Sequence, residues 1–221
     1  LIGIKACWRR PLRIYLLLKE CIYLEANKKI LLATSNQGKL KEFKKLFSNF
    51  NFISQVELGI NDAIEDGLTF FENALKKARH GANESKLFTI ADDSGLVVPG
   101  LNFEPGIYSA RYAGEEASDL DNRNKIISEL KKRNLVSLPA YYVCVLVGVH
   151  SYDDPMPIYA SGKIHGKVCV ESQGDGGFGY DKIFYIDNPK TSMASISPEV
   201  KNTISHRAIA ARSFLVELEK I

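Results

Sequence analysis

The chain has 221 residues, of which 45% are hydrophobic and 25% are charged, and these proportions are typical of a globular protein. Its net charge of +3 depends on the first 29 residues, because from Ile30 onward 24 Asp and Glu outnumber 22 Lys and Arg. This balance excludes the basic surface of a nucleic-acid-binding protein, so we expect no nucleic-acid partner and only a local site for any small anion.

Residues 1–28 differ from the rest of the chain and are predicted to be an N-terminal extension. Basic residues precede the apolar run Ile14–Leu18, as in a secretory signal peptide. However, Lys19 and Glu20 interrupt this run, and no small-residue cleavage site follows. No other segment approaches the length of a membrane span, so we expect no membrane partner.

The four cysteines are scattered along the chain without a CxxC pair, and Cys144 and Cys169 fall in apolar segments that resemble strands. Reduced thiols in the core are therefore the preferred interpretation, ahead of a disulfide or a metal site. This pattern favours a cytoplasmic location.

From Lys29 onward the hydrophobic pattern alternates between strand-like and helix-like segments, which predicts a mixed α/β protein. Two strand-like segments after residue 156 follow each other closely and are expected to pair, so part of the sheet should be antiparallel. The predicted elements are strands at Lys29–Thr34, Leu87–Ala91, Tyr141–Val149, Pro157–Ser161, Gly162–Glu171 and Lys182–Ile186, and helices at Lys39–Phe47, from Thr69 to about Asn83, at Asp119–Arg133 and after Ser205.

The segment LLATSNQGKL, residues 31–40, changes from apolar to small polar residues where the first strand should end. A strand that leads through a tight polar turn into a helix presents unpaired N–H groups and the positive end of the helix dipole at one point, which is a site for an anion. The segment is not a Walker A loop, since Ala33 and Leu40 replace its Gly and its Ser or Thr. An ordinary turn with an exposed Lys39 is the alternative interpretation.

Asp92 and Asp93 follow directly after the predicted strand at Leu87–Ala91. Adjacent carboxylates repel each other, and a divalent cation with oxygen ligands would offset this cost. Upstream, Glu65 is another possible ligand, and Lys77 on the next predicted helix is a possible substrate contact or part of a solvated face. A turn that uses Asp and Gly for their backbone preferences explains the two aspartates equally well.

Two further segments combine glycines, aromatic rings and cations. In GDGGFGYDKIF, residues 174–184, four glycines would let the backbone approach a ligand, and Phe178 and Tyr180 could stack on a base. A flexible hairpin with core aromatic residues is the alternative. Lys201, His206 and Arg207 cluster around the start of a predicted helix, where cations are unfavourable unless an anion is nearby.

Six segments occur in order along the chain: LATSNQGKLKEF, EDGLTFFENALKKA, ADDSGL, PGIYSARYAGE, GGFGYDKIF and KNTISHRAIA. Together they resemble the noncanonical purine NTP pyrophosphatase family, the inosine triphosphatase-like enzymes, and residues 29–221 are therefore expected to form one NTP pyrophosphatase domain. The resemblance implies an α/β fold in which two lobes of a mixed central sheet enclose a substrate cleft, and a homodimer. It also implies Mg²⁺-dependent hydrolysis of inosine, deoxyinosine and xanthosine triphosphates to the monophosphate and pyrophosphate.

Carried over by position, the resemblance implies a role for each matching residue. Asp93 would be the catalytic carboxylate that activates water and helps to bind Mg²⁺, and we expect Glu65 and Asp92 as further metal ligands. Members of the family often carry two acidic residues in this segment, whereas here Ile64 precedes Glu65. The expected substrate contacts are Thr34, Ser35, Asn36, Gln37, Gly38 and Lys39 at the triphosphate, together with Lys77, Ser94, Phe178, Gly179, Tyr180, Asp181, Lys201, His206 and Arg207.

Two other functions stay open at this point. A related nucleotide pyrophosphatase with another base preference would keep the carboxylates and cations but differ in the aromatic loop. A non-catalytic nucleotide-binding module would tolerate the loss of Asp93, whereas this chain carries the whole acidic and basic set.

Overall fold

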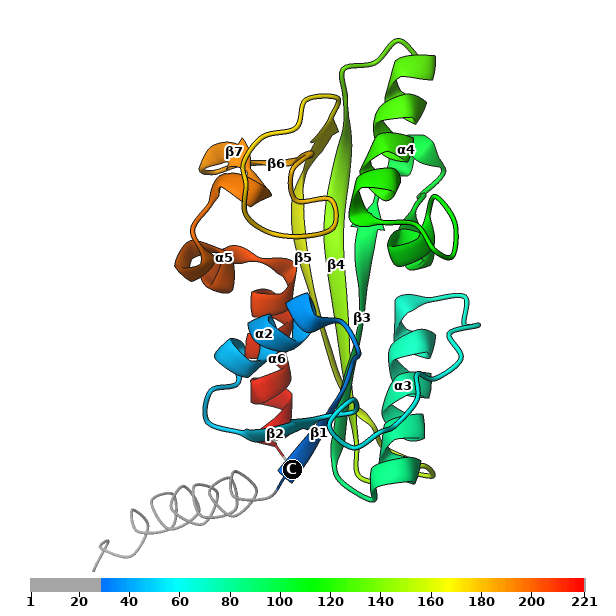
Figure 1. Ribbon diagram of the computed structural model, residues 1–221. Coiled ribbons are helices and arrows are strands. Elements are labelled where there is room, and N and C mark those ends of the chain that lie inside the picture. Colours follow the sequence, from blue (N-terminus) through cyan, green and yellow to red (C-terminus); the bar gives the residue numbers. More distant parts are fainter. Residues whose placement is uncertain (1–28, 221) are drawn as a thin grey trace, which may run out of the picture.

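A seven-stranded sheet with the strand order β2-β1-β3-β4-β5-β6-β7 forms the centre of the protein in a computed structural model that describes residues 29–220 (Figure 1). The pairs β1/β2 and β1/β3 are parallel, and every later pair is antiparallel, which confirms the prediction of a mixed sheet in an α/β protein. The strands are β1 (Lys29–Ala33), β2 (Asn51–Ser54), β3 (Thr89–Val97), β4 (Ser137–Val149), β5 (Ile158–Cys169), β6 (Phe184–Asp187) and β7 (Lys190–Ser192).

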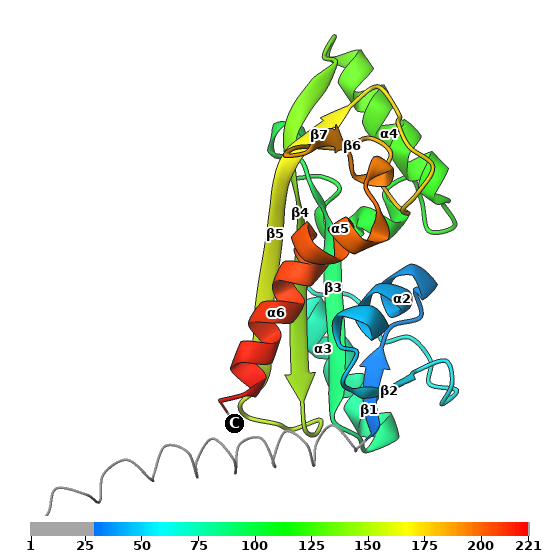
Figure 2. The ribbon, with the colours of Figure 1, turned by 90° about the vertical axis from the view of Figure 1, so that its left-hand side faces the viewer.

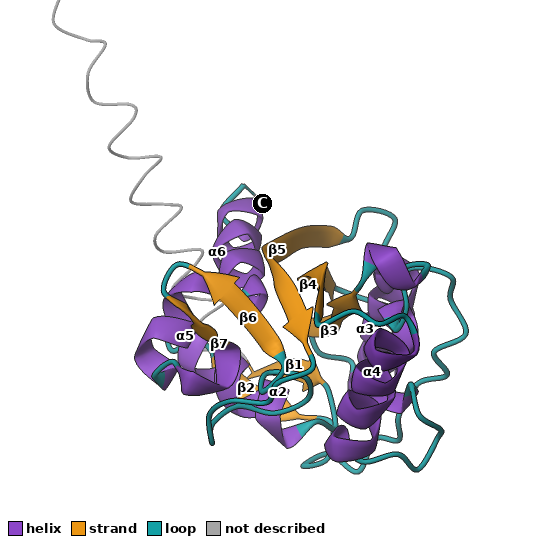
Figure 3. Ribbon diagram, turned by 90° about the horizontal axis from the view of Figure 1, so that it is seen from above, coloured by secondary structure: helices purple, strands orange, loops and turns teal. Residues whose placement is uncertain are grey.

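Helices cover both faces of the sheet (Figures 2 and 3). Helices α3 (Phe70–Ser85) and α4 (Asp119–Lys132) lie on one face, and α2 (Gln37–Leu46), α5 (Pro198–Ile204) and α6 (His206–Leu218) lie on the other. Short 3₁₀ helices occur at Pro99–Leu101, Gly106–Arg111 and Met193–Ser195. A capping box of Thr69 and Glu72 starts α3 where the sequence predicts a helix from Thr69, and Ser205 caps α6 at its predicted start.

Three buried clusters hold these layers together. Near α4, Leu96, Ile126 and Phe184 belong to one cluster. Between α2, α6 and the sheet, Phe43 and Phe214 belong to a second, and a third consists largely of alanines where α3 packs closely on the strands. The first cluster lies in the upper part of the molecule in Figure 1 and the other two in the lower part, which gives the two lobes of the predicted fold.

Strand β3 is longer than predicted, and this changes the setting of the two aspartates. The prediction of a strand that stops at Ala91 is wrong, because β3 continues to Val97 with β4 paired along its whole length. In contrast, β1 pairs with β3 only as far as Ala91. Asp92 and Asp93 therefore lie in the middle of β3, at the point where its other edge loses its partner strand.

Strand β5 is continuous, so the prediction of two strands that meet at Gly162 is wrong. A Cβ atom at Gly162 would lie 2.2 Å from the carbonyl oxygen of His206 and 2.4 Å from the backbone nitrogen of Ala210. Glycine is therefore required here because the backbone of α6 lies directly on the strand, rather than because the chain turns. This close approach positions the first residues of α6.

The sequence-based prediction also missed several short helices and strands. β2, β7 and α5 were not predicted, and Lys201 lies in α5 rather than at the start of the last helix. β6 begins two residues later than the strand predicted at Lys182–Ile186, and α2 begins at Gln37 rather than Lys39. Strands of three or four residues carry too little hydrophobic periodicity to be recognised.

Among the described residues, Cys144 and Cys169 are free thiols, as predicted, and the first is buried while the second is half-buried. Cys7 and Cys21 lie outside the described residues, as does the predicted extension, residues 1–28, so its boundary stays a prediction. No helix between residues 29 and 220 has both the length and the apolar character needed to cross a membrane.

Candidate active site

A cavity of about 350 Å³ opens where β1 ends beside the middle of β3. The ends of parallel strands are the usual place for a ligand in an α/β sheet. The cavity brings together most of the predicted site residues: Thr34, Ser35, Asn36, Lys39, Glu65, Lys77, Asp93, Ser94, Phe178, Gly179, Tyr180, Asp181, His206 and Arg207. Gln37, Gly38, Asp92 and Lys201 do not line it.

The first turn of α2 borders the cavity. Asn36 is the N-cap residue, and its side chain accepts a hydrogen bond of 3.0 Å from the backbone N–H of Lys39. The helix begins with no acidic residue in its first turn, so the positive end of its dipole is not neutralised locally. This arrangement agrees with the anion site predicted for residues 34–39.

Asp92 and Asp93 point to opposite faces of β3, because successive side chains of a strand alternate. Asp92 is buried and forms an ion pair of 2.9 Å with Lys39 of α2. Burial opposes the charge of Asp92, but Lys39, Lys77 and Arg207 outweigh this effect and lower its pKa. The structure thus does not bring Asp92 to Glu65 and Asp93 as the predicted third metal ligand, and a lysine neutralises it instead.

Asp93 faces α3 and shares the ammonium group of Lys77 with Glu65. The Lys77 Nζ atom lies 3.1 Å from Asp93 Oδ1 and 3.1 Å from Glu65 Oε1. Burial raises the pKa of Asp93, and the charges of Glu65 and Asp92 raise it further against the opposite effect of Lys77 and Lys39. A carboxylate with a raised pKa is a stronger base than an ordinary one, which suits proton transfer from water.

The donor set around Asp93 fits a magnesium ion that is bound together with a phosphate ligand. No group of three or more His, Cys, Asp or Glu side chains in the described part of the chain is arranged to hold a metal ion. Mg²⁺, however, is commonly bound through only one or two carboxylates plus substrate phosphates and water. Asp93 and Glu65, which already flank one cation, meet this requirement.

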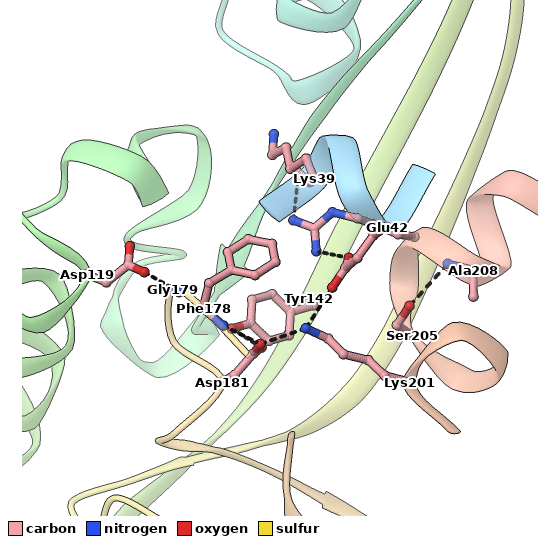
Figure 4. A network of polar contacts seen from close by, with 12 residues as sticks. Lys39, Glu42, Asp119, Tyr142, Phe178, Gly179, Asp181, Lys201, Ser205 and Ala208 are labelled. Atoms are coloured by element: carbon pink, nitrogen blue, oxygen red, sulfur yellow. Dashed lines mark hydrogen bonds and ion pairs between the residues drawn. The ribbon is translucent and has the colours of Figure 1, made fainter. Parts of the chain in front are cut away.

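A network of buried charges lies beside the cavity and reaches its lining at Asp181 and Arg207 (Figure 4). Lys201 Nζ lies 2.8 Å from both Asp181 Oδ2 and Glu42 Oε1, and Glu42 Oε2 accepts a hydrogen bond of 3.1 Å from Arg207. Asp181 also accepts hydrogen bonds from Tyr142 and from a backbone N–H. Glu42 thus supplies the negative charge that allows Lys201 of α5 and Arg207 of α6 to lie close together.

Phe178 lies between this network and the first turn of α2. Its ring centre is 4.9 Å from Lys201 Nζ and 5.0 Å from the central guanidinium carbon of Arg207. A Cβ atom at Gly38 would lie 3.0 Å from the ring, so a side chain at that position would push against it. Gly38 therefore gives space to Phe178, in addition to any role of its backbone.

His206 is buried and stacks on Tyr142 with 4.7 Å between the ring centres. Neither of its ring nitrogens has a hydrogen-bond partner within residues 29–220, although the side chain lines the cavity. Burial, followed by the charges of Arg207, Lys201 and Lys39, lowers the pKa of His206 well below its ordinary value. His206 is therefore a neutral group that offers one donor and one acceptor to a ligand.

This low pKa of His206 gives a testable dependence of stability on pH. Below about pH 6.5 a histidine in the unfolded chain binds a proton that the folded protein excludes, so the free energy of unfolding should fall as the pH decreases. The slope from this group can reach about 1.4 kcal/mol per pH unit. Urea unfolding of the wild type and of His206→Phe between pH 7 and pH 5 measures it. The variant keeps the stacking on Tyr142, and its free energy of unfolding should fall less than that of the wild type as the pH decreases. An equal fall in both proteins would contradict the low pKa of His206.

Several residues of the site were not predicted. Glu42 lies in the predicted helix Lys39–Phe47, and nothing in its local pattern indicates two buried partners. Asn73, one turn before Lys77, lies 3.5 Å from Asp93. The cavity is also lined by Asp62, Gly95, Leu96, Ile107, Ser109, Ala110, Arg111, Asp119 and Tyr142. The segment PGIYSARYAGE contributed to the resemblance and could have indicated Ser109 and Arg111.

The chain is similar to known proteins over most of its length. A model described as the Ham1 family matches residues 30–217. A dITP/XTP pyrophosphatase of Legionella pneumophila (strain Paris) is 47% identical over 183 residues, which cover 83% of this chain and 94% of that protein. A HAM1 protein from Coxiella burnetii has a solved structure with a TM-score of 0.81 and 37% identity, and it covers 87% of this chain and 99% of its own.

The structure of the Staphylococcus aureus Ham1 protein is also similar, with a TM-score of 0.76 and 40% identity over 87% of this chain and 99% of its own. These matches confirm both the predicted fold and the resemblance inferred from the six sequence segments. Because the family model spans nearly all of the described residues, this chain belongs to the Ham1 family.

Proposed function

We propose that this protein hydrolyses inosine, deoxyinosine and xanthosine triphosphates to the monophosphate and pyrophosphate. One observation carries the proposal: a single cavity is lined by a basic carboxylate, the N-terminus of a helix, an aromatic ring and the buried cation Arg207. This is the arrangement that a triphosphate attached to a purine requires. The relative from Legionella pneumophila, named a dITP/XTP pyrophosphatase, supports the same substrate class.

In the proposed complex, the first turn of α2 and the side chain of Lys39 bind the phosphates. The ammonium group of Lys39 lies at the cavity wall, where Asp92 holds it at 2.9 Å. Lys77 adds a second positive charge beside Asp93. Backbone N–H groups and lysines at one point are a common phosphate site, since both donate hydrogen bonds and neutralise charge.

Asp93 is the proposed general base. Its carboxylate would orient a water molecule and accept its proton as the bond between the α and β phosphates breaks. Asp93 and Glu65 would hold Mg²⁺, whose charge would neutralise the negative charge that develops on the phosphate oxygens. Lys77, within 3.1 Å of both carboxylates, would keep them in place before the substrate arrives.

The base is proposed to stack on Phe178, which contributes affinity without distinguishing one base from another. Selection would come from hydrogen bonds at the edge of the purine, made by Arg207 and by the neutral ring of His206. Donors aimed at a 6-oxo group would stay unpaired against the amino group of adenine, which carries a cost.

We also propose that the domain formed by residues 29–221 acts as a cytoplasmic homodimer without nucleic-acid or membrane partners. The balance of charge after Ile30 and the family resemblance support this set of proposals. Light scattering on a size-exclusion column tests the dimer, because a monomeric mass at micromolar concentration would overturn it.

The substrate proposal predicts that kcat/KM for inosine triphosphate exceeds that for ATP by about a hundredfold, because two unpaired polar groups cost about 1 to 3 kcal/mol each. Phe178→Ala should lower kcat/KM about tenfold or more for both nucleotides and keep their ranking, since stacking is worth about 1 to 3 kcal/mol for any base. Pyrophosphate release over a panel of nucleoside triphosphates with Mg²⁺ measures both effects.

Tyr152→Ala is the matched control, because Tyr152 is an exposed aromatic residue outside the cavity. It should leave both values of kcat/KM unchanged. Equal efficiencies of the wild type for ATP and inosine triphosphate would disprove the proposed substrate class.

A further inference from the structure

Two side chains of α4 hold the backbone of Gly179 from both sides. The Asp119 carboxylate accepts a hydrogen bond of 2.7 Å from the N–H of Gly179, and the Arg123 guanidinium donates one of 2.7 Å to the carbonyl oxygen of Gly179. These residues lie 60 and 56 positions away along the chain. Figure 4 shows Asp119 directed toward Gly179, beside Phe178.

The loop that carries Phe178 needs such support. Residues 174–179 include four glycines, and Gly174, Gly177 and Gly179 have positive φ angles of 88°, 73° and 59°. Glycines lose more conformational freedom on ordering than other residues, so a glycine-rich loop is costly to hold in one conformation. Asp181 binds the N–H of Phe178 from the other side, at 3.0 Å.

From these contacts we infer that Asp119 and Arg123 are positioning residues that hold Phe178 in place for the nucleotide base. The inference rests on the proposed function for its substrate. The Gly179 N–H belongs to the peptide group that follows Phe178, so Asp119 and Asp181 hold the peptide groups on both sides of the Cα atom that carries the ring. Arg123 holds the next peptide group of the loop. α4 thus contributes to substrate affinity through Phe178, even though Arg123 does not line the cavity.

A structural role in α4 alone is the competing explanation, and the helix itself offers a control. Asp121 is also an exposed aspartate in the first turn of α4, but its carboxylate accepts hydrogen bonds from Ser118 in the capping box and does not contact the loop. Asp121→Ala should therefore weaken the start of α4 without releasing Gly179. Asp119→Asn removes the charge of Asp119 but keeps an oxygen that can accept the hydrogen bond.

The first measurement is amide hydrogen exchange, which needs no substrate. In Asp119→Ala, exchange at the Gly179 amide should become about fivefold faster or more, because a hydrogen bond of about 1 kcal/mol is lost. Asp119→Asn and Asp121→Ala should exchange at that amide as the wild type does. Unchanged exchange in Asp119→Ala would overturn the inference.

The second measurement is steady-state hydrolysis of inosine triphosphate. Asp119→Ala and Arg123→Ala should each raise KM about fivefold, the equivalent of one hydrogen bond, with kcat changed less than twofold. In a Phe178→Ala background, Asp119→Ala should add almost nothing, since the ring through which it acts is gone.

Three results would overturn the inference: a KM increase in Asp121→Ala equal to that in Asp119→Ala, an equal increase in Asp119→Asn, or an undiminished effect of Asp119→Ala without Phe178. A wild-type protein that does not hydrolyse inosine triphosphate would instead refute the proposed function. The exchange measurement would then still decide whether α4 holds the loop.

Discussion

Replacing Asp93 with Asn should lower kcat for inosine triphosphate about a thousandfold, since a positioned general base contributes about 10² to 10⁴ in rate. The amide has the same shape as the carboxylate but cannot accept a proton, and it removes one negative charge from the proposed metal ligands. KM should change little, because the lost interaction matters mainly in the transition state. Steady-state pyrophosphate release measures both constants.

The fold should tolerate this change. Lys77 keeps Glu65 as a partner at 3.1 Å, and burial already disfavours the charged form of Asp93. Asp66→Asn serves as the control, because Asp66 is an exposed aspartate in a neighbouring segment that pairs with Lys76 outside the cavity. This control should hydrolyse inosine triphosphate as the wild type does. Turnover by Asp93→Asn close to the wild-type rate would show that another group is the base.

Lys201→Met should be the most destabilising of the substitutions considered, lowering the free energy of unfolding by about 3 to 5 kcal/mol. Lys201 lies between the carboxylates of Asp181 and Glu42, 2.8 Å from each. Only 5% of the Asp181 side chain and 15% of the Glu42 side chain is exposed, so little water would replace the lost ammonium group. Urea unfolding followed by circular dichroism measures the change.

Two further variants test the origin of this loss. Lys132→Met removes a lysine that pairs with Glu129 on the surface, where 67% of its side chain is exposed, and should cost less than about 1 kcal/mol. Adding Asp181→Asn to Lys201→Met should recover part of the stability, because it removes an uncompensated buried charge. A decrease of less than about 1 kcal/mol in the free energy of unfolding of Lys201→Met would mean that Lys201 does not neutralise the buried carboxylates of this network.

The family was recognised from sequence segments in which residues interact with close neighbours along the chain. Thr69 and Glu72 form the capping box of α3, and Ser205 caps α6, at the helix starts that the sequence predicts. In contrast, α2 follows its N-cap Asn36 and begins two residues earlier than predicted. Such caps involve residues three positions apart, so the sequence shows both partners together. The apolar run Tyr141–Val149 is also a local signal, and it predicted most of β4, although the strand begins earlier, at Ser137.

The two aspartates show where prediction from sequence reached its limit. Asp92 and Asp93 look equivalent in the segment ADDSGL, but their environments differ because a strand directs them to opposite faces. Lys39 of α2 neutralises the first, whereas the second shares Lys77 of α3 with Glu65. Which aspartate faces α3 and which faces α2 depends on how these helices cover the two faces of β3, and no local pattern encodes that packing.

The sequence by itself determined the order of most elements, the helix caps and the set of chemical groups available for a nucleotide. Only the tertiary structure decided which groups meet: Glu42 with Lys201 and Arg207, the start of α6 with Gly162, and Asp119 with Gly179. Periodicity and capping act between residues a few positions apart, whereas these contacts join residues separated by 44 to 165 positions. Their energies depend on burial and on the charge of distant partners, which exist only once the sheet and its covering helices have assembled.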